Sequence, residues 1–464
     1  MFQNTKSQNT NRRDFIKLSS MAGISLALPK ENISAPAVLK NGLNDKLRIG
    51  FIGTGLRGRD HVGLILNRTD CIITAICDTD PKALAETQKD IAKAGKPKPT
   101  EYGTNERDFL RMLDKEKLDA VIIATPWEWH SEPALACMKR GIYVATEVWG
   151  AFSLDECWNL VNTHEATGTH LFFLENVCYR RDIMAIMNMV RQNMFGELIH
   201  TECGYQHDLR EVKFNDGIQP YGGGVEFGEK GFSEAHWRTN HSVHRNADLY
   251  PTHGIGPVAM MMDINRGNRF MYLTSTATKS RGLHNYILNH PKGGEGHPNA
   301  KVEFKLGDIV STVIKCSNGE TVILSHDTNS PRPYSLGFRV QGTKGIWMDV
   351  NNSLYIEGTS AKAHRWEQAD AYLKKYDHPL WQKFEKEAEG AGHGGMDFFV
   401  LNSFIEGVKR NLPPAIDVYD AATWLSITAL SEASIATGSA PQAFPDYTRG
   451  RWMNKKNEFG LGEF

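Results

Sequence analysis

Two groups of residues in this 464-residue chain have types and spacing that suit chemistry. The first is Gly53-Thr-Gly-Leu-Arg-Gly58, whose glycines allow a tight turn and let the backbone approach a pyrophosphate closely. Asp78 follows 20 residues after Gly58 and can accept hydrogen bonds from both hydroxyls of an adenosine ribose. Its charge repels the 2′-phosphate of NADP, and the next residue, Thr79, is no arginine. The pattern therefore predicts a site for NAD.

The second group lies in two neighbouring segments, residues 236–241 and 248–254. Arg238 can donate a fork of hydrogen bonds to sugar hydroxyls or to an acetamide carbonyl, and Trp237 can stack on a sugar face. His253 has the side chain of a general base. Each side chain alone fits an ordinary structural role about as well. Together they predict a polar pocket that holds a sugar.

The elements of the first half fit a dinucleotide-binding fold. An apolar strand at 46–53 runs into the glycine segment, and a helical pattern and a second strand follow it. The alternative, a glycine-rich turn without a ligand, fits this context poorly. Strands and helices continue to alternate, which predicts a parallel, doubly wound sheet. The predicted strands are 46–53, 71–77, 118–124, 143–148 and 170–176, and the helices are 59–67, 83–94, 130–140 and 155–167.

Ligands of such sheets bind at the carboxyl ends of the strands. Three segments follow strand ends in this chain, namely 127–130, 147–148 and 175–176. We expect all three to face the cofactor. For the tryptophans of the first segment, packing in the core is a competing role.

The regular alternation of predicted strands and helices ends near Arg180. Its later strands have no helices between them, which predicts a second α+β domain with an open, mostly antiparallel sheet. The predicted strands are 198–205, 270–278, 308–316, 321–326, 336–342 and 345–350, and the helices are 181–193, 381–389, 396–409 and 421–437. The predicted domains are residues 45–178 for NAD and 179–464 for the substrate.

Composition excludes several classes of protein. Hydrophobic residues make up 41% and the net charge is -1, which excludes wholesale disorder. A near-neutral chain lacks the basic surface that binds nucleic acid or an anionic membrane. The seven cysteines are scattered without a C-x-x-C pair, so we expect buried thiols and no metal site.

The first 40 residues are predicted to be a signal and linker. Arg12-Arg13 precedes a short, mildly apolar segment, which resembles a twin-arginine export signal. The alternative is a chance arginine pair in a tail. The apolar part is too short to span a membrane. We therefore expect the protein to be periplasmic or otherwise exported.

Several motifs carry a family resemblance. The glycine segment, the Ala-Thr-Pro after the third predicted strand and His130 resemble the glucose–fructose oxidoreductase / inositol dehydrogenase family. That family has Glu-Lys-Pro where this chain has Glu147-Val148-Trp149, so the lysine of simple dehydrogenases is missing. The fuller set resembles glycoside hydrolase family 109, which contains NAD-dependent α-N-acetylgalactosaminidases. That set is Leu56-Arg-Gly58, Thr125-Pro-Trp-Glu-Trp-His130, Glu147-Val-Trp-Gly150, Glu175-Asn-Val-Cys-Tyr179, Tyr250-Pro-Thr-His-Gly254 and the leader.

The family 109 resemblance implies the site residues. The implied acid/base groups are His253 and Tyr205, with Glu175 orienting or relaying. The implied substrate contacts are Tyr205, Arg238, Tyr250, His253 and Tyr334. The implied cofactor contacts are Gly53, Gly55, Leu56, Arg57, Gly58, Asp78, Trp127, Glu128, Trp129, His130, Glu147, Val148 and Asn176.

The resemblance also implies a reaction in which a hydrolase uses NAD. The sugar is oxidised at C3, loses a proton from C2, expels the aglycone, takes up water and is reduced again.

The expected partners are a glycan or glycoside with terminal N-acetylgalactosamine and, through the C-terminal sheet, a second copy of the chain. Two other functions remain open: a sugar or polyol dehydrogenase that releases NADH, and a non-catalytic sensor of sugar and nucleotide.

Overall fold

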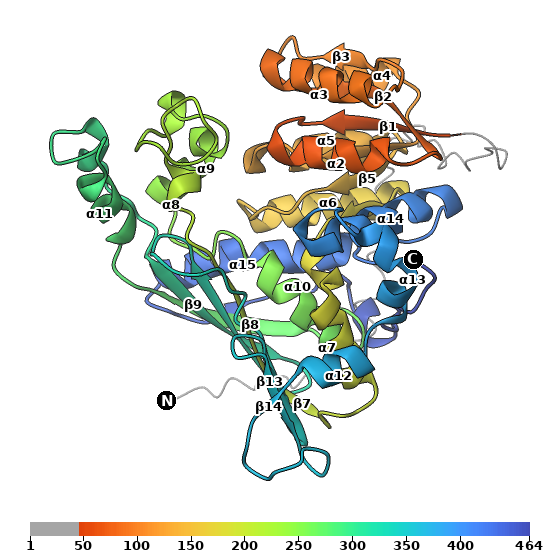
Figure 1. The fold of residues 1–464 in the computed structure, drawn as a ribbon, viewed down its shortest axis with the longest axis vertical. Coiled ribbons are helices and arrows are strands. Elements are labelled where there is room, and N and C mark those ends of the chain that lie inside the picture. The colour runs from red at the N-terminus through yellow and green to blue at the C-terminus, as the bar shows by residue number, and fades with distance from the viewer. Residues whose placement is uncertain (1–45) are drawn as a thin grey trace, which may run out of the picture. The chain divides into compact units, whose positions relative to one another are not determined.

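The computed structural model describes residues 46–464, so the predicted leader lies outside the described residues. The first half forms a six-stranded sheet in the order β3-β2-β1-β4-β5-β6, with every neighbouring pair parallel. This order confirms the predicted doubly wound sheet (Figure 1). The strands are β1 (Leu47–Ile52), β2 (Cys71–Cys77), β3 (Thr100–Tyr102), β4 (Ala120–Ile123), β5 (Tyr143–Thr146) and β6 (Leu171–Phe173).

The helices of this half begin and end where local chemistry dictates. The side chain of Asp80 caps the first turn of α3, and Pro81 occupies its first position. Gly168, with φ 68°, ends α6 in the left-handed region. The sequence predicts neither β3 nor α4, because both are short and β3 is mostly exposed. The helices are α2 (Leu56–Leu66), α3 (Pro81–Lys93), α4 (Asp108–Lys115), α5 (Ser131–Lys139) and α6 (Leu154–Thr167).

The second half forms a nine-stranded sheet in the order β14-β13-β12-β11-β7-β10-β9-β8-β15. The predicted open, mostly antiparallel sheet is confirmed, except that β7 and β10 pair in parallel. A parallel pair needs a long crossover, and the chain between them contains four helices and two strands. The strands are β7 (Leu198–Gln206), β8 (Phe270–Ala277), β9 (Ile309–Cys316), β10 (Thr321–Asp327), β11 (Arg339–Gly342), β12 (Gly345–Met348), β13 (Ser353–Ile356), β14 (Glu367–Gln368) and β15 (Gln442–Ala443).

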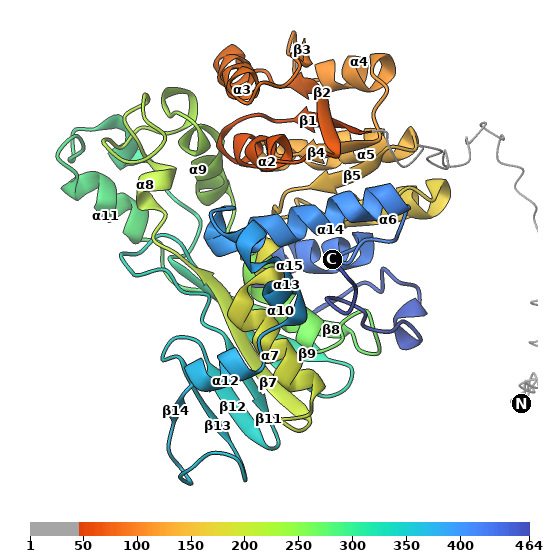
Figure 2. The same cartoon turned by 45° about the vertical axis from the view of Figure 1, so that its right-hand side comes forward.

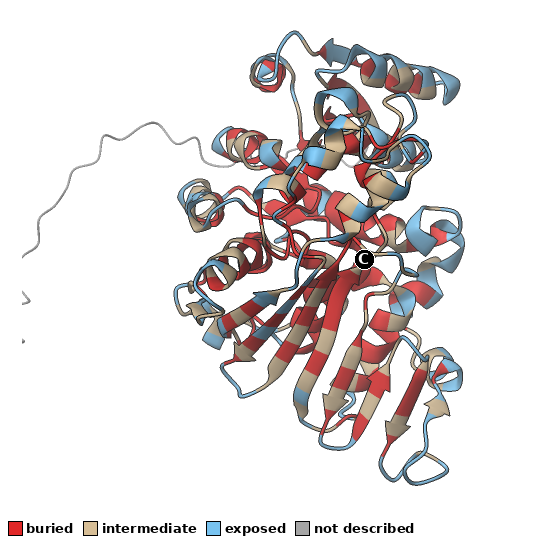
Figure 3. Ribbon diagram, turned by 90° about the vertical axis from the view of Figure 1, so that its left-hand side faces the viewer, coloured by how far each residue is buried: buried red, intermediate tan, exposed pale blue. Residues whose placement is uncertain are grey.

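Helices cover one face of the nine-stranded sheet. Helices α7, α10 and α15 lie on that face (Figures 1 and 2). Strand β9 alternates exposed and buried residues along most of its length, as expected where the opposite face meets solvent, and Figure 3 looks onto that face. The helices of this half are α7 (Arg181–Arg191), α8 (Arg210–Lys213), α9 (Glu234–His244), α10 (Thr252–Met261), α11 (Gly282–Asn289), α12 (Asp370–Lys375), α13 (Pro379–Ala388), α14 (Met396–Arg410) and α15 (Val418–Ala436).

The two sheets share one continuous apolar core. Helix α14 comes late in the chain but packs against α2 and the 3₁₀ turn η2 (Asn176–Tyr179) of the first half. Helix α14 therefore brings residues of the second half to the dinucleotide fold. A separate, smaller apolar cluster that includes Phe214, Leu283 and Phe304 lies under α11.

The cysteines are confirmed as buried and unpaired at all seven positions. Burial raises the pKa of the Cys137 and Cys157 thiols far above the ordinary value, so both stay neutral. Among residues 46–464, no helix combines the length and apolar character needed to cross a bilayer.

Candidate active site

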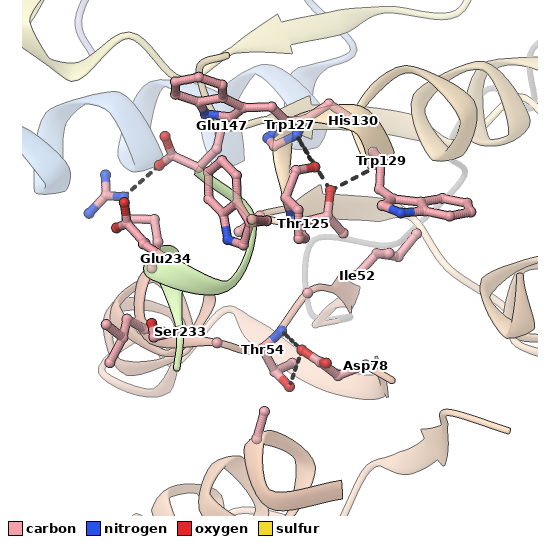
Figure 4. A pocket seen from close by; sticks show the side chains of 18 of the residues that line it. Ile52, Thr54, Asp78, Thr125, Trp127, Trp129, His130, Glu147, Ser233 and Glu234 are labelled. Atoms are coloured by element: carbon pink, nitrogen blue, oxygen red, sulfur yellow. Dashed lines mark hydrogen bonds and ion pairs between the residues drawn. The ribbon is translucent and has the colours of Figure 1, made fainter. Parts of the chain in front are cut away.

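A cavity of about 820 Å³ lies between the strand ends of the first sheet and helices α9 and α10. The glycine segment, the end of β2 and the 3₁₀ turn η1 (Trp127–Trp129) line it from the first half. Residues 231–234 and 236–238, Tyr205 and His253 line it from the second half. Figure 4 shows Asp78 and Thr54 on one side of this space and Trp127 and Glu147 on the other. The predicted cofactor and sugar groups therefore share one cavity.

The glycine segment has the shape that a pyrophosphate requires. Gly53 has φ +86°, and a Cβ there would lie 2.5 Å from the Ala124 carbonyl oxygen. A Cβ on Gly58 would lie 2.1 Å from the Gly53 oxygen, so that glycine lets the helix pack close to β1. Gly55 faces open space and caps α2 without a side-chain hydrogen bond. The first N–H groups of α2 are thus available to an anion, which fits NAD.

Asp78 lies directly after β2 and lines the cavity. Its Oδ2 accepts hydrogen bonds from Thr54 N at 2.6 Å and from Thr54 Oγ1 at 3.3 Å, as Figure 4 shows. Its Oδ1 accepts from Asp80 N at 2.9 Å. These bonds fix the carboxylate at the place where a ribose would lie. The residue therefore fits its predicted role.

Arg57 is the centre of an ion cluster in the cavity wall. Its Nε donates to Glu147 Oε1 at 2.6 Å, and His61 Nε2 lies 2.6 Å from the same oxygen. Burial alone raises the pKa of the Glu147 carboxyl, but the Arg57 charge and the His61 hydrogen bond hold it well below the ordinary value. Glu147 is therefore ionised; its Oε1 contacts these two side chains, and its Oε2 accepts from the Val148 N–H at 3.1 Å.

The sequence does not predict two residues of this cluster, Asp397 and His393. Asp397 in α14 accepts from both terminal nitrogens of Arg57, at 2.7 and 2.9 Å, and from Asn176 Nδ2 at 2.7 Å. His393 Nδ1 lies 2.7 Å from Asp397 Oδ2, which raises the pKa of His393. The Asp397 contacts to Arg57 and Asn176 span 340 and 221 residues, so no local motif marks them.

Arg238 lies in an aromatic cage on the sugar side of the cavity. Its guanidinium carbon lies 4.8 Å from the ring centre of Trp127, 5.4 Å from that of Trp237 and 5.5 Å from that of Tyr250. Its Nε lies 2.5 Å from a carboxylate oxygen of Glu234 in the same helix. Stacking and pairing hold the guanidinium in place for a polar ligand. Trp127 both packs in this cage and lines the cavity.

His130 and Trp129 also line the cavity. The His130 ring stacks on Trp149 at 4.9 Å, and its Nδ1 lies 3.1 Å from the Pro126 carbonyl oxygen. Burial lowers the pKa of His130 to about 4, so the ring is neutral near pH 7. The guanidinium of Arg107 lies 5.8 Å from the Trp129 ring centre.

His253 and Glu175 form a hydrogen-bonded pair. His253 Nδ1 lies 2.8 and 2.9 Å from the two oxygens of Glu175, whose side chain is completely buried. A carboxylate accepts such bonds, so Nδ1 carries the proton and Nε2 is left as a proton acceptor. His253 lines the cavity, whereas Glu175 lies behind it. The pair has the geometry of a base and the group that orients it.

The predicted tyrosines divide into two kinds. Tyr205 and Tyr250 are buried and line the cavity, with ring centres 4.7 Å apart. Tyr205 also lies 5.5 Å from the His253 ring. Tyr334 is 51% exposed and lies outside the cavity lining, at the outer side of Tyr205 with a ring separation of 6.4 Å.

Most of the predicted site thus surrounds one space. Among the predicted residues, Glu175, Gly58 and Tyr334 do not line it; Glu175 and Gly58 lie directly behind it. In the described part of the chain, no group of three or more His, Cys, Asp or Glu side chains is arranged to hold a metal ion. The predicted residues that line it are Gly53, Gly55, Leu56, Arg57, Asp78, Trp127, Glu128, Trp129, His130, Glu147, Val148, Asn176, Tyr205, Arg238, Tyr250 and His253.

Two known families match separate parts of the chain. Residues 47–174 match the oxidoreductase family with an NAD-binding Rossmann fold. Residues 179–454 match the C-terminal domain of glycosyl hydrolase 109. The chain therefore has an NAD-binding Rossmann domain.

Similar proteins cover the whole chain. A glycosyl hydrolase family 109 protein of Parabacteroides distasonis is 53% identical, and the match covers 98% of this chain and 100% of the relative. An α-N-acetylgalactosaminidase of Tannerella forsythia is 52% identical, with coverage of 98% and 100%. Among solved structures, levoglucosan dehydrogenase with NADH and levoglucosan has a TM-score of 0.60 at 16% identity, with coverage of 86% and 100%. The last likeness shows the fold alone.

Proposed function

Because the chain belongs to glycosyl hydrolase family 109, we propose that it removes terminal α-N-acetylgalactosamine from glycans by a cycle with no net redox change. The observation that carries this proposal is the shared cavity. Its lining includes His253 and Tyr205 as well as the strand ends and glycine segment of the NAD-binding domain. A relative named as an α-N-acetylgalactosaminidase, 52% identical over nearly the whole chain, supports the choice of sugar.

Bound NAD supplies the acceptor, and later the donor, of the hydride at C3 of the sugar. A ketone at C3 makes the C2 proton acidic enough for a side chain to remove. His253 Nε2, with Nδ1 held by Glu175, is one candidate base, and the Tyr205 hydroxyl is the other. Loss of the C2 proton expels the aglycone from C1. Water then adds at C1, the C2 proton is replaced and the C3 hydroxyl is restored.

The carboxylates near the cavity favour this cycle over direct hydrolysis by an acid and nucleophile pair. Glu147 is bound to Arg57 and His61, and Glu175 is completely buried behind His253. Glu234 pairs with Arg238, and Glu128 Oε2 lies 3.5 Å from His241 Nε2. Each of these four carboxylates therefore already has a basic side chain as its neighbour.

The proposal is tested with a nitrophenyl α-N-acetylgalactosaminide and no added nucleotide. We expect steady release of nitrophenol without accumulation of NADH, because the hydride returns in each turnover. A matched substrate methylated at the C3 hydroxyl should be inert. Steady NADH production from free sugar and added NAD, without nitrophenol release, would instead identify a dehydrogenase.

We also propose export by the twin-arginine route, which carries folded proteins and so suits an enzyme that keeps its cofactor. Replacing Arg12 and Arg13 by lysine should retain the protein in the cytoplasm, because the receptor reads the arginine pair as an address. Cell fractionation with antibody detection measures the distribution. Unchanged appearance of the double variant in the periplasm would contradict the proposal.

A further inference from the structure

His207 has no assigned role, yet it contacts a proposed acid/base group. Its Nδ1 lies 3.2 Å from the Tyr205 hydroxyl oxygen. The chain leaves β7 between these two residues, and the His207 N–H donates to the Asp327 carbonyl oxygen at 2.9 Å. That backbone bond fixes the main chain of His207 next to β10. The hydroxyl of Tyr205 therefore has a hydrogen-bond partner outside the cavity lining.

Tyr205 needs such a partner if it is to take a proton from the sugar. Burial raises the pKa of its phenol well above the ordinary value, and the nearby Arg238 charge offsets only part of this effect. The phenol is therefore protonated near neutral pH. It can accept a substrate proton only by passing its own proton to another group.

His207 has the properties of that group. Burial lowers the pKa of its imidazole, and the Arg238 charge in α9 lowers it further. Asp208 beside it and Glu234 in α9 act in the opposite direction, and His253 in α10 lowers the pKa again. The net direction is downward, so the ring is neutral near pH 7 and can accept a proton.

The ring also contacts an exposed side chain outside the cavity lining. His207 is half-buried, and its outer neighbour is the half-exposed Tyr334, whose ring centre lies 4.9 Å away. A proton accepted at Nδ1 can leave from Nε2 to water. Tyr205, by contrast, is only 9% exposed and packs against Tyr250 and His253.

We propose that His207 is the relay residue that takes the hydroxyl proton of Tyr205 when Tyr205 accepts a proton from the sugar. In that step the Tyr205 O–H bond breaks and an N–H bond forms at His207 Nδ1, while the sugar proton restores the phenol. The imidazolium then loses its Nε2 proton to water, and the reverse sequence returns a proton to the sugar. This inference rests on the proposed function, and His207 acts only through Tyr205.

The test compares His207→Ala, His207→Gln and Tyr205→Phe in the NAD-containing protein. We expect His207→Ala to lower kcat by about 10²-fold with little change in KM and with NAD retained. Imidazole added to the buffer should restore much of the rate of His207→Ala, and should leave Tyr205→Phe unchanged because that variant has no hydroxyl to relay. His207→Gln, which can still hydrogen-bond but cannot carry a proton, should stay slow.

The pH profile is a second readout. Protonation of His207 blocks the relay, so the wild-type rate should fall on the acid side, at a pH below the ordinary histidine value of about 6.5. This limb should be absent in His207→Gln. Wild-type rates in both His207 variants would overturn the relay, as would a slow His207→Ala that retains NAD but does not respond to imidazole. If the wild-type protein releases no aglycone from any α-N-acetylgalactosaminide, the proposed function itself fails.

Discussion

Replacing His253 by alanine is expected to lower the rate of aglycone release by about 10²–10⁴-fold, the usual effect of losing a general acid or base. The ring lines the cavity and its Nδ1 is bound by both oxygens of Glu175, so Nε2 is the free nitrogen. NAD should remain bound, because the predicted cofactor contacts all lie in the first half of the chain and do not include His253. Steady-state kinetics with a nitrophenyl substrate and the nucleotide content of the purified protein measure the two effects.

Two further variants sharpen this prediction. Glu175→Gln keeps the volume of the side chain but removes the charge that orients His253, so its loss of rate should be smaller than that of His253→Ala. His244→Ala, at an exposed histidine of α9, is the matched control and should keep the wild-type rate. A His253→Ala protein with NAD bound and a wild-type rate would exclude His253 from the chemistry.

Replacing Asp78 by alanine is expected to remove NAD and activity together. The carboxylate is held by Thr54 and Asp80 at the end of β2, and hydrogen bonds of a charged group to two ribose hydroxyls contribute about 1.5–3 kcal/mol each. Their loss corresponds to at least about a tenfold weaker affinity for each bond. Release of nucleotide on denaturation, followed by chromatography, measures the NAD carried by the purified variant.

The control for this variant is Asp114→Ala. Asp114 pairs with Arg140 on the surface and is far exposed, so its removal should leave NAD and activity unchanged. Asp78→Asn should be intermediate, because the amide oxygen still accepts a hydrogen bond from Thr54. Full activity of Asp78→Ala in protein shown to be free of nucleotide would contradict a cofactor role in the reaction.

Features that lie close together in the sequence could be predicted. The glycine segment and Asp78 belong to one strand–helix–strand unit, so their spacing alone indicates the site. The parallel order of the first sheet follows from the alternation of strands and helices. His253 and Arg238 stand in segments that are visibly rich in polar and aromatic residues.

Features that depend on tertiary contacts could not be predicted. Asp397 and His393 meet Arg57 only because α14 packs against α2, and no pattern near either residue indicates this. The sequence likewise gives no sign that β7 pairs in parallel with β10. His207 is only two residues from Tyr205, but this spacing alone does not show that its Nδ1 lies 3.2 Å from the hydroxyl oxygen.

The most direct test of the redox-neutral cycle is the reaction of an aryl α-N-acetylgalactosaminide in deuterated water, with the sugar product analysed by nuclear magnetic resonance and mass spectrometry. Elimination breaks the C2–H bond and solvent later supplies the replacement. We therefore expect the product to carry deuterium at C2, and unreacted substrate without enzyme to carry none. A product that retains protium at C2 would mean direct displacement at C1, and Glu128, Glu147 and Glu175 would then have to be considered as an ordinary acid and nucleophile.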